Sequence, residues 1–323
     1  MHKLADYLIT LATDSAKLAQ FGVDPITAVQ GALLSSDAVT ALLSGDCAQI
    51  NAVLAAEMGA VPAVVQPKRR KASGARGTLT VAGLGITLIH HVSLEALEAI
   101  RRADRVVYLV PTPGIVAWLI RENANVESLA DTYDPQRQRG DTYEEMVERV
   151  LQVVRSGENV CFAISGHPGV GVHASHAAIR RARQEGFAAR MMPGISAEAV
   201  LVADLGIDPV DVGWHSLEAS DFVANDHCID TAVVLILWQV GVVGITTAWV
   251  SPKPYVPGLH RLVEALRRYY PENHEVIVYE AATYPVCDPV IQSIAVKDLV
   301  SAKITPSTTL FIPPCSGRVR RVD

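Results

Sequence analysis

The stretch NVCFAISGHPGVGVHASHAAIRRARQE, residues 159–185, contains the pattern that decides the fold. It opens with an apolar run at 159–164 that is typical of a buried strand, and it closes with helical periodicity at 172–185. Between them lies a loop, residues 165–170, that contains two glycines and a proline. Strand, side-chain-poor loop and helix in this order make one step of a parallel α/β sheet, and such sheets bind ligands at the carboxyl ends of their strands. The loop therefore predicts a pocket.

The same alternation extends over residues 77–211. Strands are expected at 78–82, 105–110 and 187–192, and helices at 93–103, 142–155 and 196–205. Strands dominate after residue 211, at 214–218, 232–238, 275–279 and 308–312, with one helix at 259–270. We therefore expect an α/β protein with two lobes, residues 77–211 and 212–323, a mixed sheet in the second lobe and a ligand cleft between the two.

The chain begins with a region in which only helices are expected. Leu4, Leu8 and Leu11 share one helical face, Asp24-Pro25 is a helix start, and Gly45 is a helix stop. Residues 1–58 are accordingly expected to form a small all-α domain of four or five short helices. Residues 59–76 are rich in Pro, Lys, Arg, Ser and Gly around an apolar segment at 60–65, and predict a linker.

Composition excludes several classes of protein. The net charge is −6, and one basic cluster, residues 68–71, lies in the expected linker, so we expect no nucleic-acid partner. Apolar runs are too short to cross a membrane and the first helix lacks the features of a signal peptide, so we expect a cytoplasmic protein. The five cysteines are scattered without CxxC spacing, which predicts neither a disulfide framework nor a zinc site.

Histidines gather near the central loop, but no metal is expected there. His167, His173 and His176 have no Asp, Glu or Cys beside them that would complete a ligand set. Core packing or helix capping explains them better.

Two further loops occupy equivalent positions after strands. Gly83 and Gly85 follow the first strand in VAGLGIT, residues 81–87, which lacks the third glycine of a dinucleotide fingerprint and fits a tight turn as well as a ligand loop. In MPGISAE, residues 192–198, Ser196 is placed to cap a helix, and capping alone would explain that motif. Because the three loops recur at the same topological place, they are expected to line one cleft.

The densest group of polar side chains is the run 133–143, which contains Tyr133, Arg139 and Tyr143. Its simplest interpretation is a solvated loop that leads into a helix capped by Asp141 or Thr142. The alternative is a catalytic group.

Taken in order, the GxG, GxPG and PGxS loops resemble those of the tetrapyrrole (corrin and porphyrin) methylases. The region 77–314 is more closely similar to the peptide backbone α-N-methyltransferases of borosin biosynthesis, of the omphalotin type. The similarity is carried by residues 133–143, 166–170, 191–209, 218–222, 239–245 and 307–314.

Residues 1–58, above all ALLSGDCAQINAVLAAE at 41–57, resemble the helical borosin-binding, or clasp, domain. In the fungal enzymes that domain follows the methyltransferase and precedes a core peptide, whereas here it comes first and the chain ends soon after Pro314, so no C-terminal core is expected.

The resemblance implies a site for S-adenosylmethionine and a catalytic group. It assigns Tyr133, Arg139 and Tyr143 to catalysis, with Tyr143 as general base and the other two as donors to the amide oxygen; Arg139 should lower the pKa of Tyr143. Two positions depart from the family pattern, Ser165 and Ala130, where aromatic residues are usual, which implies a wider substrate channel or slower turnover. The implied cofactor residues are Gly83, Gly85, Gly166, His167, Pro168, Val170, Ser196, Ala197, Gln239 and Thr309.

The source of the peptide is left open by the sequence. A separate precursor is one possibility, and the chain's own segment 59–66 is the other. The linker interpretation of that segment is preferred, because about 18 residues can hardly be anchored at both ends and also thread the active site of the same subunit. A homodimer that presents the segment to its partner would relax this limit. A tetrapyrrole or corrin methylase and a catalytically degenerate peptide-binding protein are the alternative functions.

Overall fold

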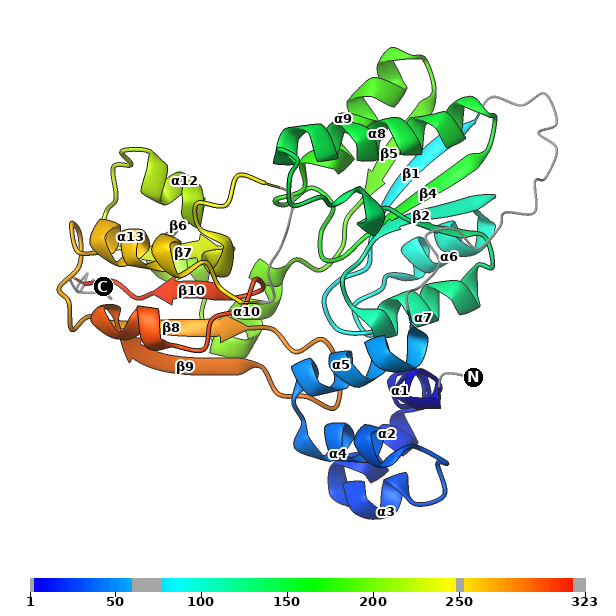
Figure 1. Ribbon diagram of the computed structural model, residues 1–323, viewed down its shortest axis with the longest axis horizontal. Helices are drawn as coiled ribbons and strands as arrows, with labels where there is room; N and C mark the ends of the chain where they lie inside the picture. Colours follow the sequence, from blue (N-terminus) through cyan, green and yellow to red (C-terminus); the bar gives the residue numbers. More distant parts are fainter. Residues whose placement is uncertain (1–2, 60–76, 248–252, 316–323) are drawn as a thin grey trace. The chain divides into compact units, whose positions relative to one another are not determined.

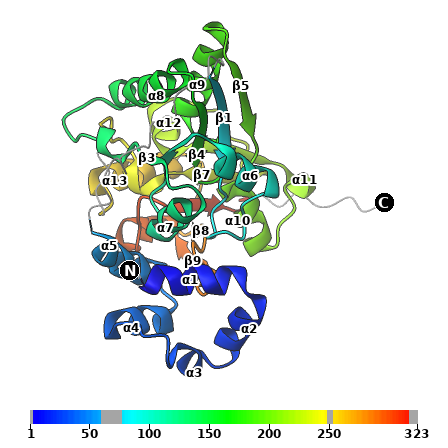
Figure 2. The same ribbon diagram turned by 90° about the vertical axis from the view of Figure 1, so that its right-hand side faces the viewer.

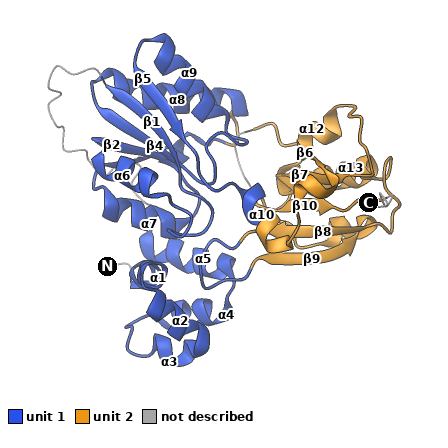
Figure 3. Cartoon of the chain, turned by 180° about the vertical axis from the view of Figure 1, so that it is seen from behind, with its two compact units in different colours: residues 1–134, 139–200, 282–288 blue, residues 135–138, 201–281, 289–323 orange. Residues whose placement is uncertain are grey.

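The structure, a computed structural model, describes residues 3–59, 77–247 and 253–315 (Figure 1). Residues 60–76 of the expected linker and possible core segment, 59–76, lie outside the described residues. Two compact units divide the chain (Figure 3). Unit 1 comprises residues 1–134, 139–200 and 282–288, and unit 2 comprises residues 135–138, 201–281 and 289–323. The lobe boundary at residue 211 stays a proposal.

The helical module consists of α1 (Lys3–Thr13), α2 (Ser15–Val23), α3 (Pro25–Val29), α4 (Ser36–Ser44) and α5 (Cys47–Met58). Side-chain oxygens cap the helix starts: Asp14, Asp24, Ser35 and Asp46 each accept a hydrogen bond from a backbone amide of the helix that follows. Gly45 ends α4 in the left-handed conformation, at φ 64°. The helix content expected for residues 1–58 is therefore present (Figure 2).

Unit 1 also holds a parallel sheet in the order β3-β2-β4-β1-β5. Its strands are β1 (Thr78–Gly83), β2 (Arg105–Leu109), β3 (Val126–Ser128), β4 (Asn159–Ile164) and β5 (Ala188–Met192). Alternate residues of a strand point to opposite faces, so Val107 and Phe162 pack with α8 (Arg139–Arg155) and α9 (His173–Gln184), while Val106 and Cys161 face the side of α6 (Leu94–Arg102) and α7 (Pro113–Glu122). The short 3-10 helix η1 (Ala130–Thr132) follows β3.

The helical module shares its core with this sheet layer. Leu4, Leu8 and Leu54 are fully buried in the same apolar cluster as Ile115 and Leu119 of α7. Helix α7 is apolar on nearly all sides because the sheet layer covers one side and α1 and α5 cover the other (Figure 1). The module is thus part of unit 1.

Unit 2 contains a mixed sheet in the order β6-β7-β10-β8-β9. Strands β6 (Trp214–Glu218) and β7 (Val234–Trp238) are parallel, whereas β10 (Thr309–Ile312) runs antiparallel to β7 and to β8 (Glu275–Glu280), and β9 (Val290–Ala295) antiparallel to β8. Helices α12 (Ala219–Ala224) and α13 (Val256–Leu266) pack on it with the 3-10 helices η2 (Val240–Val242) and η3 (Val296–Ser301). Helix α10 (Ala197–Leu205) and α11 (Pro209–Val212) precede β6.

The expected α/β class with a mixed second sheet is confirmed, with one local correction. Helix α8 begins at Arg139, so Thr142 is a fully buried residue inside the first turns and neither it nor Asp141 is the cap at a loop's end. Arg139 and Tyr143, four residues apart, consequently share a face of that helix. Among the described residues, no helix is long and apolar enough to cross a membrane.

Candidate functional site

Three loops that follow neighbouring strands of unit 1 meet at the carboxyl edge of its sheet. A Cβ placed on Gly83, the last residue of β1, would lie 2.6 Å from the carbonyl oxygen of Gly166 and 2.7 Å from Cα of Gly194. Gly166 follows β4 and Gly194 follows β5, and β1 lies between these two strands. Only glycine permits this approach, so the expected meeting of the three loops is found within unit 1.

Backbone hydrogen bonds hold the first two loops together. The amide of Gly166 donates to the carbonyl of Gly85 over 2.8 Å, and the amide of Gly85 donates back over 3.2 Å. Both glycines have positive φ, 69° for Gly85 and 70° for Gly166. His91 fastens the first loop further, because its Nδ1 accepts from the amide of Thr87 over 3.1 Å.

The central loop is braced by side chains of its own and of α9. His167 Nδ1 accepts from the amide of Gly169 over 2.9 Å, and His176 Nε2 lies 3.0 Å from the Gly169 carbonyl. The buried hydroxyl of Ser175 donates to the Pro168 carbonyl. Two of the three histidines noted in the sequence thus fix the loop's backbone, and Ser175, which the sequence did not single out, does the same. The described residues contain no group of three His, Cys, Asp or Glu side chains that could hold a metal.

The third loop ends in a helix cap. Ser196 Oγ accepts from the amide of Ala199 over 3.1 Å, and α10 starts at the next residue, Ala197. Ser196 therefore caps α10, as expected from the sequence. Val170, in the central loop, is half exposed.

The three expected catalytic residues lie together in unit 1. Tyr133 follows η1, and Arg139 and Tyr143 lie on the first turns of α8. Partial burial raises the pKa of Tyr133 to about 12, although 36% of the residue stays exposed; the phenol of Tyr143 acts in the same direction, and the guanidinium of Arg139 opposes them. Tyr133 therefore lies within electrostatic range of Arg139 and Tyr143, which share a face of α8, and the three side chains are called the catalytic cluster below.

A ring contact links this cluster to the central loop. Tyr143 stacks on His173 with ring centroids 5.9 Å apart and planes inclined by 22°. His173 is the first residue of α9, directly after the loop that contains Gly166 and Gly169. From the sequence, His173 is expected only to pack in the core or cap a helix, because sequence spacing does not reveal that its ring lies next to Tyr143.

Ser165, the first residue of the central loop, has a buried hydroxyl. Among the described residues Ser165 Oγ is buried and has no hydrogen-bond partner. A buried hydroxyl without a partner loses its hydration, so a ligand with a polar atom would stabilise it there. The glycines and this hydroxyl fit the implied S-adenosylmethionine, whose polar groups require backbone and hydroxyl partners.

The two remaining expected cofactor residues belong to unit 2, where they lie at one end of its sheet. Gln239 follows β7, Thr309 begins β10, and the amide of Val240 donates to the carbonyl of Thr308 over 3.1 Å. Gln239 has φ 59°, a left-handed conformation that is strained for a residue with a side chain and recurs at ligand sites.

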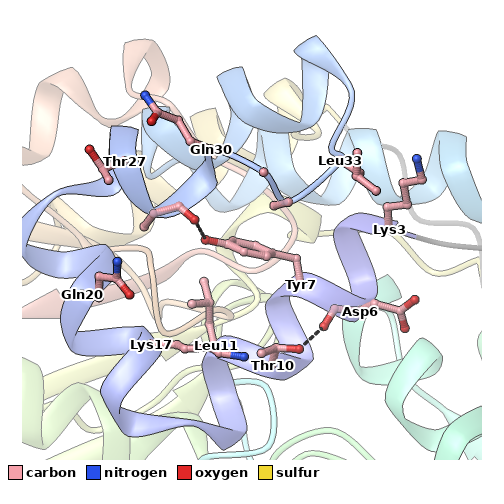
Figure 4. A pocket seen from close by; sticks show the side chains of 13 residues that line it. Lys3, Asp6, Tyr7, Thr10, Leu11, Lys17, Gln20, Thr27, Gln30 and Leu33 are labelled. Carbon is pink, nitrogen blue, oxygen red and sulfur yellow. Dashed lines mark hydrogen bonds between the residues drawn. The ribbon is translucent and has the colours of Figure 1, made fainter.

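A separate hollow of about 660 Å³ lies in the helical module, and Figure 4 shows its lining. The side chain of Tyr7 lies in this hollow, and its hydroxyl donates to the carbonyl of Ala28 over 2.9 Å. Lys3, Lys17 and Asp6 give it mixed charge, and none of the expected catalytic or cofactor residues contributes to it.

Several known proteins are similar to this chain in sequence or in fold. The family model of the tetrapyrrole (corrin/porphyrin) methylases matches residues 78–292. The chain is 39% identical over 243 residues to a methyltransferase/ribosomally synthesized cyclic peptide gymnopeptides precursor of Gymnopus fusipes, covering 74% of this chain and 57% of that protein. It is 38% identical over 255 residues to the corresponding omphalotin A precursor of Omphalotus olearius, covering 76% of this chain and 60% of that protein. The chain thus spans less than two thirds of the length of these relatives.

Solved structures share the fold at lower identity. A uroporphyrin-III-C-methyltransferase from Thermus thermophilus aligns with a TM-score of 0.55 at 19% identity, covering 74% of this chain and 93% of that one. A cobalt precorrin-4 methyltransferase aligns with a TM-score of 0.53 at 18% identity, covering 73% and 94%. The cofactor of the tetrapyrrole methylases is S-adenosylmethionine, as the sequence resemblance implied. With a family match over residues 78–292 and methyltransferase/cyclic peptide precursors among its curated relatives, the chain belongs to the tetrapyrrole (corrin/porphyrin) methylase family.

Proposed function

We propose that the protein transfers methyl groups from S-adenosylmethionine to backbone amide nitrogens of a ribosomally made peptide. The observation that carries the proposal is the cluster of Tyr133, Arg139 and Tyr143, which the stack on His173 attaches to the central glycine loop. The names of the fungal relatives, which join a methyltransferase to a cyclic peptide precursor, support the same substrate class.

The chemistry explains why such a cluster is needed. An amide nitrogen is a poor nucleophile because its lone pair is delocalised into the carbonyl group. In methylation the N–H bond breaks, an N–CH₃ bond forms and the S–CH₃ bond of the donor breaks, which leaves an N-methyl amide, S-adenosylhomocysteine and one proton. When bound, S-adenosylmethionine supplies the electrophilic methyl group, and the loops with Gly83, Gly166 and Ser196 would hold it.

The three side chains have distinct tasks in this proposal. Tyr143 accepts the amide proton, and Arg139 stabilises the negative charge that collects on the amide oxygen. Tyr133, whose pKa is raised to about 12, keeps its proton at neutral pH and donates a hydrogen bond to the same oxygen. The general base and the oxygen-binding groups thus lie on one helix and the turn before it.

The peptide is either a separate precursor or the chain's own segment 59–66, presented to the site by the second subunit of a homodimer. The experiment is to incubate the purified protein with S-adenosylmethionine that carries a trideuterated methyl group, alone and with a synthetic peptide of residues 59–66. Labelled methyl groups on the chain indicate self-modification, and label on the peptide indicates a substrate supplied in trans. If S-adenosylmethionine binds in calorimetry but neither acceptor gains label, this segment is not the substrate. If the cofactor does not bind at all, the proposed function fails.

A further inference from the structure

One side of the helical module is held by residues 282–288, a segment that belongs to unit 1 although the strands before and after it belong to unit 2. Tyr284 is fully buried there, and its hydroxyl donates to Oδ1 of Asn51 on α5 over 2.6 Å while it accepts from the amide of Gly114 on α7 over 3.3 Å. The carbonyl of Thr283 accepts from the amide of Leu88 over 2.9 Å. The segment is therefore fastened on three sides.

Two cysteines meet in this contact. Cys47 is the first residue of α5, and its Sγ accepts a hydrogen bond from the amide of Thr283 over 3.4 Å. Cys287 lies in the same segment, where its own amide donates to the carbonyl of Tyr284 over 3.1 Å. A Cβ placed on Gly45, two residues before Cys47, would lie 3.8 Å from the carbonyl oxygen of Val286, the neighbour of Cys287. Both side chains are half buried and pack against the same apolar cluster.

The surroundings favour a thiolate at Cys47. The interaction with the Cys287 thiol, together with the hydrogen bond from the Thr283 amide, lowers the pKa of Cys47 to about 6, against the opposing effect of burial. The interaction with Cys47 and burial raise the pKa of Cys287. A thiolate held beside a second thiol is the arrangement found in redox-active cysteine pairs. Cys161, by contrast, is buried in the sheet, where desolvation raises the pKa of its thiol to about 12.

We propose that Cys47 and Cys287 form a reversible disulfide when the protein meets a peroxide. The Cys47 thiolate attacks one oxygen of hydrogen peroxide, the O–O bond breaks, and the products are a sulfenic acid and hydroxide, which takes up a proton. The Cys287 thiol then attacks the Cys47 sulfur, the S–S bond forms and water leaves. In total two thiols and one peroxide give one disulfide and two waters.

The disulfide would tie the helical module to the segment between β8 and β9. The two cysteines are 287 − 47 = 240 positions apart in the sequence, so the bond closes a long loop, and closing a long loop restricts the unfolded chain strongly. Oxidation therefore stabilises the existing contact between the module and this segment against unfolding, and reduction removes that added stability. This inference does not depend on methyl transfer, because its readouts are covalent bonds and melting temperature.

Peptide mapping of the full chain tests the proposal. The reduced protein is treated with hydrogen peroxide, remaining thiols are blocked with iodoacetamide, and the digest is searched for linked peptides. We expect a Cys47–Cys287 linkage that dithiothreitol reverses, and a higher melting temperature for the oxidised protein. Cys287→Ser should leave a sulfenic acid on Cys47 that dimedone traps, and Cys47→Ser should abolish both products.

The exposed cysteines provide the control. Cys228→Ser and Cys315→Ser should form the linkage at the wild-type rate. The alkylation rate of Cys47 in reduced protein should rise through a midpoint near pH 6. Three results would overturn the proposal: linkages that form mainly at Cys228 or Cys315, disulfides between chains, or a Cys47 that iodoacetamide still alkylates after peroxide treatment. Because the wild-type map decides on its own, a variant that does not fold would not weaken the test.

Discussion

Tyr143 of α8 lies stacked on His173 of α9, with ring planes inclined by 22°. This contact joins the polar cluster to the loop at the carboxyl end of β4, although the two residues are separated by β4 and its loop in the sequence. We therefore expect His173 to position Tyr143 without taking part in proton transfer. His173→Ala should lower kcat by up to ~100-fold through misplacement of the base, and His173→Phe, which can still stack, should recover most of it. A pH–rate profile that keeps its shape in both variants would separate positioning from acid–base catalysis.

The catalytic cluster makes the most direct prediction for mutation. Tyr143→Phe and Arg139→Ala should each reduce methyl transfer by roughly 10²- to 10⁴-fold, because one removes the base and the other the charge opposite the amide oxygen. Folding and cofactor affinity should stay as in the wild type, as measured by circular dichroism and calorimetry. Arg268→Ala, which removes an exposed arginine of unit 2, is the matched control and should keep full activity. An Arg139→Ala variant with wild-type kcat would exclude the role assigned to that residue.

The pH dependence of the reaction follows from Tyr133. Its pKa is raised to about 12, mainly by burial, so the phenol remains a hydrogen-bond donor as pH rises and is lost only near pH 12. The rate constant kcat/KM should increase with pH as Tyr143, the general base, ionises. Because Tyr133 keeps its proton, the profile should show no falling limb below about pH 10. Tyr133→Phe should lower the whole profile without moving its midpoint. A falling limb below pH 9 that disappears in Tyr133→Phe would mean that the phenol ionises far earlier.

The contact among the three site loops predicts which glycines tolerate a methyl group. In Gly83→Ala the new Cβ would lie 2.6 Å from a backbone oxygen that belongs to another loop, so the loops must separate. We expect a loss of about 1–3 kcal/mol in unfolding free energy and weaker S-adenosylmethionine binding. Gly22→Ala is the control, because among the described residues no atom beyond the local backbone of α2 lies within 4 Å of its Cβ position, and α2 gains a better helix former. Chemical denaturation and calorimetry measure both effects, and a Gly83→Ala protein with unchanged affinity would contradict the close packing.

Docking of the helical module depends on the buried phenol of Tyr284. Tyr284→Phe leaves Oδ1 of Asn51 and the amide of Gly114 without this partner, which should cost about 1–3 kcal/mol. Tyr255→Phe, whose ring is exposed, should cost almost nothing. Urea denaturation followed by the fluorescence of the four tryptophans, one of which, Trp118, is buried in α7, reports the difference. Equal stability of the two variants would show that the hydroxyl contributes nothing to docking.

Local patterns predicted most elements, and their failures have a physical cause. Helix α7 was not predicted, because a helix that is buried on nearly all sides lacks the polar face on which periodicity depends. Strand β9 was missed for the opposite reason: most of its residues are exposed, so no apolar alternation marks it. The helix start at Arg139 was placed three residues too late, since Asp141 and Thr142 look like cap residues and nothing local shows that Thr142 is buried.

The candidate site was predictable where chemistry follows from local sequence. Glycines after strands predicted the loops at the sheet edge, and Gly83 and Gly166 lie where expected. Contacts between residues far apart in the sequence were not predictable. The stack of Tyr143 on His173 and the hydrogen bond between Tyr284 and Asn51 correspond to no local sequence pattern. The roles of the three catalytic residues and of the cofactor residues stay predictions.

The measurement that tests the central claim most directly is localisation of the transferred methyl group by tandem mass spectrometry. The protein is incubated with deuterium-labelled S-adenosylmethionine and a peptide of residues 59–66, and fragment ions of the peptide and of the chain itself are compared between wild type and Tyr143→Phe. Wherever label appears on the peptide or on the chain, our account predicts it on backbone nitrogens and not at Pro62, which has no amide hydrogen, and predicts its loss in Tyr143→Phe. Label confined to side chains, or backbone label that persists undiminished in Tyr143→Phe, would contradict it.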